Sequence, residues 1–181
     1  MSEIAVGLGE LREEFSQAFG GLDYGQFNWK PSEDMWSVGQ CIDHLVVTNN
    51  LELPAIERAA KGEHTQTFWE RLPFFPTMFG NILLKAIDPS SNRKFKAPKS
   101  YSPTKSEVDL TRLNDYLELS EKICGLDEAT ESFDRTRAII TSPISSLVTH
   151  SLETAFRVVL LHDRRHFEQA KRVTELTGFP G

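Results

Sequence analysis

The segment that follows Ser151 constrains the fold of this chain more than any other. Small and apolar residues recur there every three or four positions, with basic residues between them, which predicts one long amphipathic helix over about residues 151–176. His162 and His166 fall on the apolar side of this helix. Because residues four apart on a helix lie one above the other, we expect both imidazole rings to point inward, toward a partner element.

A third histidine, His44, lies in a separate helical segment far upstream. Histidine is the commonest metal ligand in proteins, and three neutral imidazoles leave one coordination position open for water or a substrate. We therefore predict a metal site formed by His44, His162 and His166. The alternative, in which each ring is a core residue bonded to a carbonyl or a carboxylate, stays open at this point.

Two further long helices are predicted in the first third of the chain. The first covers about residues 3–19 and ends at a pair of glycines. The second covers about residues 37–60 and starts at a capping box, in which a serine is followed three residues later by a glutamine. Pro54 should kink this helix or end its first part, because proline lacks the backbone N–H. Residues 27–36, between the two helices, are expected to form a loop.

The remaining long helix is predicted over about residues 104–125, from a second capping box to a glycine. The proline-rich stretch 62–103 separates it from the second helix and holds one short apolar run, 78–87, which we interpret as a short helix between two loops. Residues 128–150 contain the β-branched run 138–141 and predict an extended connector.

Four long helices with one elaborated, proline-rich connection between the second and the third describe an all-α protein, a four-helix bundle. The composition, 39% hydrophobic and 25% charged residues, suits one buried core, and we expect a single domain over residues 1–181. The net charge of -6 argues against binding nucleic acid.

The cysteine count and the distribution of apolar residues bear on location. Cys41 and Cys124 form no disulfide framework, which is typical of a reducing compartment. The N-terminus has no basic region followed by an apolar run, and no apolar stretch approaches the ~20 residues of a membrane helix. We expect a cytoplasmic protein with a small-molecule substrate and no membrane partner.

Several common catalytic motifs are absent. Asp163 follows His162 where a zincin protease would have a glutamate, and a shorter acid would not reach the same water. The chain has no glycine-rich phosphate loop, and its Gly7-Leu-Gly9 follows no strand. No nucleophile elbow is present. Nucleotide binding and serine hydrolase chemistry therefore lack support.

Four polar residues are candidates to assist the histidines. Asp43 and Asp163 could accept hydrogen bonds from ligand imidazoles, and the alternative is that they are surface or capping groups. Asn49 and Glu52 lie one and two turns beyond His44 and could line a pocket.

Other residues near the motifs receive structural interpretations. Cys41, three residues before His44, is interpreted as a small core residue, and Trp36 as a packing residue of the bundle. His64 and His150 are not assigned to the site.

Six basic residues gather between positions 85 and 105, against one acid, Asp88. They are either part of a solvated loop or a rim that steers anions toward a pocket. The residues are Lys85, Arg93, Lys94, Lys96, Lys99 and Lys105.

Taken in order, five short motifs resemble the DinB-like superfamily of metal-binding four-helix bundles. They are Pro31, Trp36-Ser-Val38, His44-Leu45, Lys94-Phe-Lys-Ala-Pro98 and His162-Asp-Arg-Arg-His166-Phe-Glu-Gln169.

The resemblance implies that His44, His162 and His166 bind a divalent ion such as zinc or nickel. Relatives include S-transferases that use bacillithiol, mycothiol or glutathione, and relatives often form homodimers. The leading hypothesis is therefore a thiol-dependent S-transferase acting on small electrophiles, with the thiol as cosubstrate. Metal-dependent hydrolysis, or a non-catalytic metal-stabilised binding role, stays open. The proline-rich stretch departs from the family pattern, so the identity of the substrate does not carry over.

Overall fold

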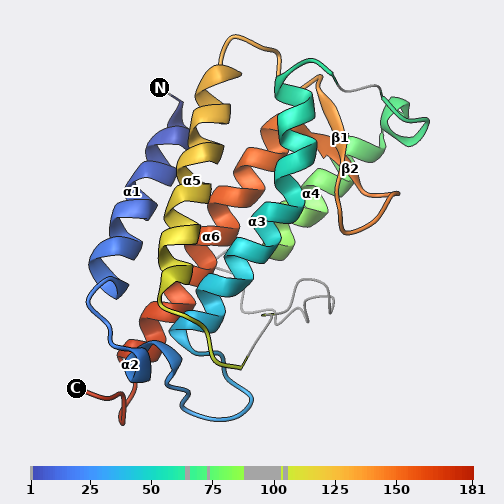
Figure 1. Ribbon diagram of the computed structural model, residues 1–181. Helices are drawn as coiled ribbons and strands as arrows, with labels where there is room; N and C mark the ends of the chain where they lie inside the picture. The colour runs from blue at the N-terminus through green and yellow to red at the C-terminus, as the bar shows by residue number, and fades with distance from the viewer. Residues whose placement is uncertain (1, 64–65, 73, 88–102, 104–105) are drawn as a thin grey trace.

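The computed structural model describes residues 2–63, 66–72, 74–87, 103 and 106–181. Its largest part is a bundle of four long helices, which stand side by side in Figure 1. They are α1 (Glu3–Phe19), α3 (Val38–Ala60), α5 (Thr111–Ala129) and α6 (Leu152–Thr174). Both α5 and α6 contact α1 and α3, so the four helices enclose one core. The prediction of an all-α four-helix bundle is confirmed.

Shorter elements surround the bundle in the described part of the chain. They are α2 (Tyr24–Asn28), the 3-10 helix η1 (Trp69–Arg71), α4 (Phe75–Ile87), β1 (Ile139–Thr141) and β2 (Thr149–Ser151). The two strands pair antiparallel, with Ile140 opposite His150. Helix α4 packs against β2 and α6, on the side of the bundle away from α1 (Figure 1).

Serine side chains fix the starts of α3 and α6, the two helices that carry the histidines. At α3, Ser37 Oγ accepts from the N–H of Gln40 at 3.1 Å, and Gln40 Oε1 accepts from the N–H of Ser37 at 3.2 Å. At α6, Ser151 Oγ accepts from the N–H of Thr154 at 3.1 Å. Such caps satisfy N–H groups that have no partner within the helix, at about 1 kcal/mol each. They also confirm the predicted starts of both helices.

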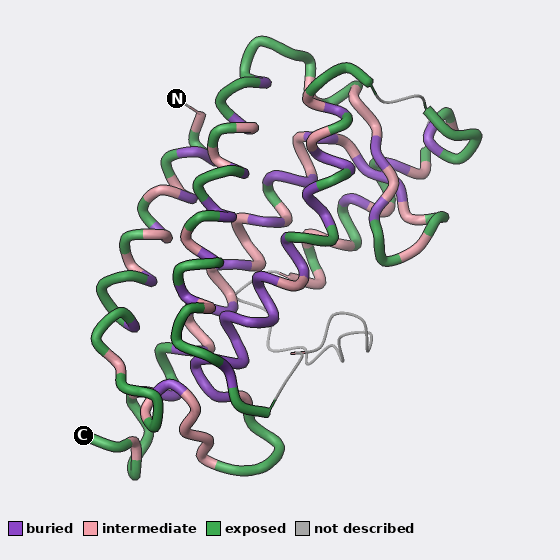
Figure 2. The backbone as a smooth tube through the Cα atoms, in the orientation of Figure 1, coloured by how far each residue is buried: buried purple, intermediate pink, exposed green. Residues whose placement is uncertain are grey.

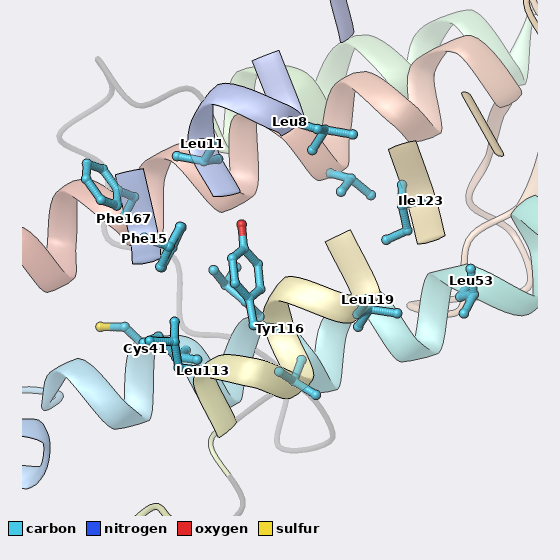
Figure 3. Close-up of a cluster of buried hydrophobic side chains, with 14 of the residues drawn as sticks. Leu8, Leu11, Phe15, Cys41, Leu53, Leu113, Tyr116, Leu119, Ile123 and Phe167 are labelled. Atoms are coloured by element: carbon cyan, nitrogen blue, oxygen red, sulfur yellow. The ribbon is translucent and has the colours of Figure 1, made fainter. Parts of the chain in front are cut away.

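Aromatic rings fill the core where α1, α5 and α6 meet. The ring of Phe15 lies 4.4 Å from that of Tyr116 and 5.1 Å from that of Phe167, measured between centroids. Figure 3 shows these rings among leucines of α1 and α5. Figure 2 shows that buried residues follow the inward sides of the four helices, as the apolar periodicity predicts.

The third long helix differs from its predicted range at both ends. Helix α5 begins at Thr111 instead of residue 104, because Val108 is buried in an irregular segment before the helix. The side-chain amide of Asn28 pairs with both backbone groups of Val108, accepting from its N–H at 2.7 Å and donating to its C=O at 2.9 Å. These bonds satisfy the backbone outside a helix. Residues 104 and 105 of the predicted capping box lie outside the described residues.

At its other end, α5 runs past the expected stop at Gly125. The inward pattern continues beyond that glycine, since Asp127 is fully buried and pairs with Arg135. Pro54 does not end α3, which continues to Ala60. Phe27 belongs to α2 instead of a loop, because Asp23 and Gln26 form a capping box at its start.

The connections before and after α5 agree more closely with the sequence-based predictions. The β-branched run 138–141 is extended, as predicted, and its pairing with β2 makes the connector a hairpin. The short helix in the proline-rich stretch is α4, which starts three residues before the predicted apolar run. No helix of the described residues is long and apolar enough to cross a membrane.

Candidate metal centre

Helices α3 and α6 bring His44, His162 and His166 together, although 118 positions separate the first two. The Nε2 atoms of His44 and His162 lie 3.2 Å apart. The ring centroid of His166 lies 4.5 Å from that of His44 and 4.7 Å from that of His162. One nitrogen from each ring can be chosen so that all three lie within 4.8 Å of one another. The three rings thus form one cluster.

The spacing of the rings can be compared with a metal site. Imidazole nitrogens bind zinc at about 2.0–2.1 Å, and two ligands of a tetrahedral ion are then separated by roughly 3.3 Å. The 3.2 Å between His44 and His162 is close to that value. The same distance also permits a hydrogen bond between a protonated and an unprotonated nitrogen. Geometry at this pair therefore suits a bound ion without requiring one.

His166 supplies a second observation that suits a ligand. Its Nδ1 atom is buried and makes no hydrogen bond of normal geometry among the described residues, although the Gln169 side chain is close enough to the ring to raise its pKa. A buried polar atom left unsatisfied costs about 1–3 kcal/mol. Three inward imidazoles, of which His166 has this deficit, fit a cation better than they fit an apolar core.

The electrostatic environment keeps two of the rings neutral. His162 is partly exposed as a residue, but burial of its ring, together with the nearby His44 and Arg165, lowers its pKa to about 3. Burial also lowers the pKa of His166 well below the usual value, and His162 and His44 lower it further. Neutral imidazoles are the form that binds metal, so these ligands need lose no proton near neutral pH.

Trp36 forms a wall of the cluster. Its ring is nearly parallel to that of His166, at 21° and 5.8 Å between centroids, and lies 5.0 Å from the ring of His44. The prediction that Trp36 packs in the bundle is confirmed, since it lies against the core. Its contact with the histidines was missed. The signal for it is its place just before the Ser37 cap, where an apolar residue packs back on the first turns of the helix.

Asp163 is a buried group that joins three helices. Its two carboxylate oxygens accept hydrogen bonds from Asn49 Nδ2 of α3, at 3.1 and 3.2 Å, and one accepts from Tyr116 Oη of α5 at 3.1 Å. Burial raises its pKa to about 7, although the hydrogen bonds from Asn49 and from Tyr116 lower it. Asp163 is therefore no surface group, and these bonds go to an amide and a phenol instead of an imidazole.

Asp43, the other candidate carboxylate, is also buried and accepts from Arg112 Nε at 2.7 Å. The alternative of a surface group is thus wrong for both aspartates. Cys41 is fully buried in the apolar core, as expected, and burial raises the pKa of its thiol to about 12. A thiol with that pKa is protonated at neutral pH and is no nucleophile.

The remaining histidines and basic residues lie elsewhere. His150 is buried in β2, where its Nδ1 lies 3.2 Å from the carbonyl of Ser151. His64 is outside the described residues. Of the basic residues between 85 and 105, Lys85 is exposed near the end of α4, and the other five, Arg93, Lys94, Lys96, Lys99 and Lys105, are outside the described residues.

Comparison with known families matches the DinB superfamily over residues 8–170. The chain belongs to this family. The match covers all four long helices of the bundle except the ends of α1 and α6. Comparison with curated proteins and with solved structures gives no significant match.

Proposed function

We propose that this DinB-superfamily protein binds one divalent metal ion through His44, His162 and His166. We further propose that the bound ion serves thiol-dependent transfer to a small electrophilic substrate, in the reducing cytoplasm. The observation that carries the proposal is the convergence of three inward imidazoles from two helices, with one nitrogen from each ring within 4.8 Å of the others. The Nε2 atoms of His44 and His162 lie 3.2 Å apart.

The composition of the cluster favours an anionic fourth ligand. Three imidazoles carry no charge, so the two positive charges of a divalent ion would stay uncompensated in a buried site. No Asp, Glu or Cys of the described residues joins the cluster. Within the described part of the chain the protein supplies no such anion, and we propose that it comes from solution. A divalent ion lowers the pKa of a coordinated thiol, and zinc and nickel both accept soft thiolate ligands.

The protein's own groups have three tasks in this scheme. The three imidazoles hold the ion and leave one position open. The indole of Trp36 covers one side of His44 and His166 and keeps water from that side. The bonds from Asn49 and Tyr116 hold Asp163, and with it the α6 backbone next to His162, in place.

The thiol proposal is tested with cobalt in place of the native ion. A bound thiolate adds a sulfur-to-cobalt charge-transfer band, so bacillithiol, mycothiol or glutathione should produce one in the wild-type protein. Turnover of an electrophile such as monobromobimane with the same thiol should depend on metal. Both signals should vanish in His162→Ala and persist in His150→Ala, which removes a buried histidine outside the cluster.

The outcomes separate three functions. If no thiol changes the cobalt spectrum, S-transfer is excluded. Metal-dependent turnover of esters or amides without thiol would indicate a hydrolase. If chelation lowers the melting temperature while no substrate is turned over, the metal has a structural or binding role.

A further inference from the structure

A pocket of about 640 Å³ lies outside the histidine cluster, between α4 and the hairpin of β1 and β2. We call it the hairpin pocket. It is the space between Thr77 and Asn81 of α4, Ile139 of β1, and Ser151 and Thr154 at the start of α6. Figure 1 shows α4 beside the two strands. Sites for small molecules commonly measure about 300–1,000 Å³, so this pocket is large enough for one.

The hairpin pocket is separate from the histidine cluster. None of the three histidines lines it. Thr154 precedes His162 by two turns of α6, which is about 12 Å along the helix at about 1.5 Å per residue. Binding of a ligand in this pocket therefore does not depend on a bound metal.

The wall formed by α4 carries two polar side chains that are free to bind a ligand. Thr77 and Asn81 lie four positions apart, one above the other on the helix. Neither side chain makes a hydrogen bond within the described part of the chain. Between them, Gly80 brings α4 close to α6, since a Cβ there would lie 3.2 Å from the Thr154 side chain. This wall therefore offers a hydroxyl and an amide.

The start of α6 forms a second wall, with two more hydroxyls. Ser151 Oγ and Thr154 Oγ1 lie 2.9 Å apart, so one of them donates to the other. Ser151 Oγ also accepts from the N–H of Thr154 at 3.1 Å. The O–H that does not donate within the pair has no acceptor among the described residues. This wall therefore offers a donor to an oxygen of a ligand.

One acid and one base also line the hairpin pocket. The Glu70 carboxylate is buried and fixed, since its oxygens accept from Thr141 Oγ1 and from the N–H of Thr67, both at 2.6 Å. The Arg137 side chain is exposed, and its ion pair with Asp134 measures 3.8 Å, which is longer than a hydrogen bond. The two charges offset each other, so the lining as a whole favours neither an anion nor a cation.

The helix start at this pocket is not available to an anion. Helix starts often bind anions through their first N–H groups. In α6 the N–H groups of residues 152–154 already donate to oxygens of Ala138, Arg135 and Ser151, at 2.7, 3.2 and 3.1 Å. An anion in the pocket would also face the carboxylate of Glu70.

The chemistry of the lining narrows the class of ligand. No aromatic ring of the described residues lines the pocket, so a flat aromatic ligand would have no ring to stack on. Hydroxyl and amide groups both donate and accept, as the hydroxyls of a ligand do. We infer that the hairpin pocket binds a small, neutral, polyhydroxylated molecule, a sugar or a linear polyol. Its hydroxyls donate to Glu70 and exchange hydrogen bonds with Thr77 and Asn81.

Saturation-transfer NMR with glucose, maltose and sorbitol tests this inference. The melting temperature is unsuitable, because sugars excluded from the surface stabilise proteins without binding them. At least one of the three probes should bind the wild-type chain saturably, with a Kd on the order of 1 mM or tighter. Removal of metal with EDTA should leave this binding unchanged.

Substitutions in the wall formed by α4 locate the bound probe. Asn81→Leu replaces the amide by an apolar group of similar size and should weaken binding on the order of tenfold, and Thr77→Val, which removes one hydroxyl, should act in the same direction. Asn114→Leu is the matched control, because Asn114 is exposed on α5 and its side chain makes no hydrogen bond to the described residues either. This variant should bind as the wild-type chain does. Circular dichroism verifies that all three variants are folded.

Four results would overturn the inference. The first is the absence of saturable binding of all three probes to the wild-type chain, and the second is equal affinity of Asn81→Leu and Asn114→Leu. Loss of binding after EDTA treatment would assign the sugar to the metal centre instead. Displacement of the bound sugar by phosphate or putrescine would show that the pocket takes a charged ligand.

Discussion

Asp163 follows a predicted metal ligand directly in the sequence, yet its carboxylate is held by other helices. A carboxyl group this deeply buried is tolerated because each of its oxygens accepts a hydrogen bond. Tyr116 supplies one of these bonds while its ring packs against Phe15. The two roles of Tyr116, in the apolar core and in the polar contact, can be separated by mutation.

Tyr116→Phe keeps the ring and removes the hydroxyl. We expect a loss of about 1–3 kcal/mol in the free energy of unfolding, because Asp163 loses a buried donor. Urea denaturation measures this loss. Tyr24→Phe is the control, since the Tyr24 hydroxyl makes an exposed bond to Glu107, and we expect its effect to stay within about 0.5 kcal/mol. Equal effects of the two substitutions would show that the bond to Asp163 contributes nothing.

At the residue scale, spacing alone allowed the histidine cluster to be proposed. The i, i+4 pair on an apolar face predicts two stacked rings on one helix. The Ser37 cap predicts the start of the separate helix that carries His44. The partners of Asp163 and the wall formed by Trp36 depend on which helices touch at that level of the bundle. A single sequence does not contain this information.

At the scale of the elements, helix existence was predictable and helix ends were predictable where a side chain caps them. α1, α3 and α6 start at serines that accept from the first turn. In α5 the N-cap residue Leu110 makes no cap bond, and Asp109 Oδ1 accepts from the N–H of Thr111 at 2.9 Å instead. The chain before it is held by the pairing of Asn28 with Val108, which are 80 positions apart. The hairpin was predicted only as extended chain, because its pairing with β2 is also a contact between distant residues.

Glu52 lies where α3 meets the hairpin and gives this contact a pH dependence. Its Oε1 accepts from Ser142 Oγ at 3.4 Å, while its Oε2 is buried and finds no partner among the described residues. Burial raises its pKa to about 7 from 4.5. Below pH 4.5 both the folded and the unfolded chain hold this proton. Between pH 4.5 and 7 only the folded chain does, so the contribution of Glu52 to stability falls as the pH rises.

Glu52→Gln removes this ionisation and should flatten that part of the pH profile. The difference in unfolding free energy between the variant and the wild-type chain should shift in favour of the variant by on the order of 3 kcal/mol between pH 4.5 and pH 8. Urea denaturation across this pH range measures the shift. Glu57→Gln is the matched control on the same helix. The pKa of Glu57 is lowered by its hydrogen bond to Lys122, so this variant should show no such gain. Parallel profiles for Glu52→Gln and the wild-type chain would contradict the assignment.

At the scale of the whole molecule, the bundle brings together imidazoles from two antiparallel helices and leaves α4 outside. A metal that binds only the folded chain stabilises it, so chelation should lower the melting temperature of the wild-type protein.

The most direct test of the proposed metal site is the metal content of protein purified without an affinity tag, measured by inductively coupled plasma mass spectrometry. We expect about one divalent ion per chain in the wild-type protein and in His150→Ala, because His150 is buried outside the cluster. Alanine at His44, His162 or His166 should each remove stoichiometric metal. Wild-type metal content in the triple alanine variant would contradict the assignment of these three histidines.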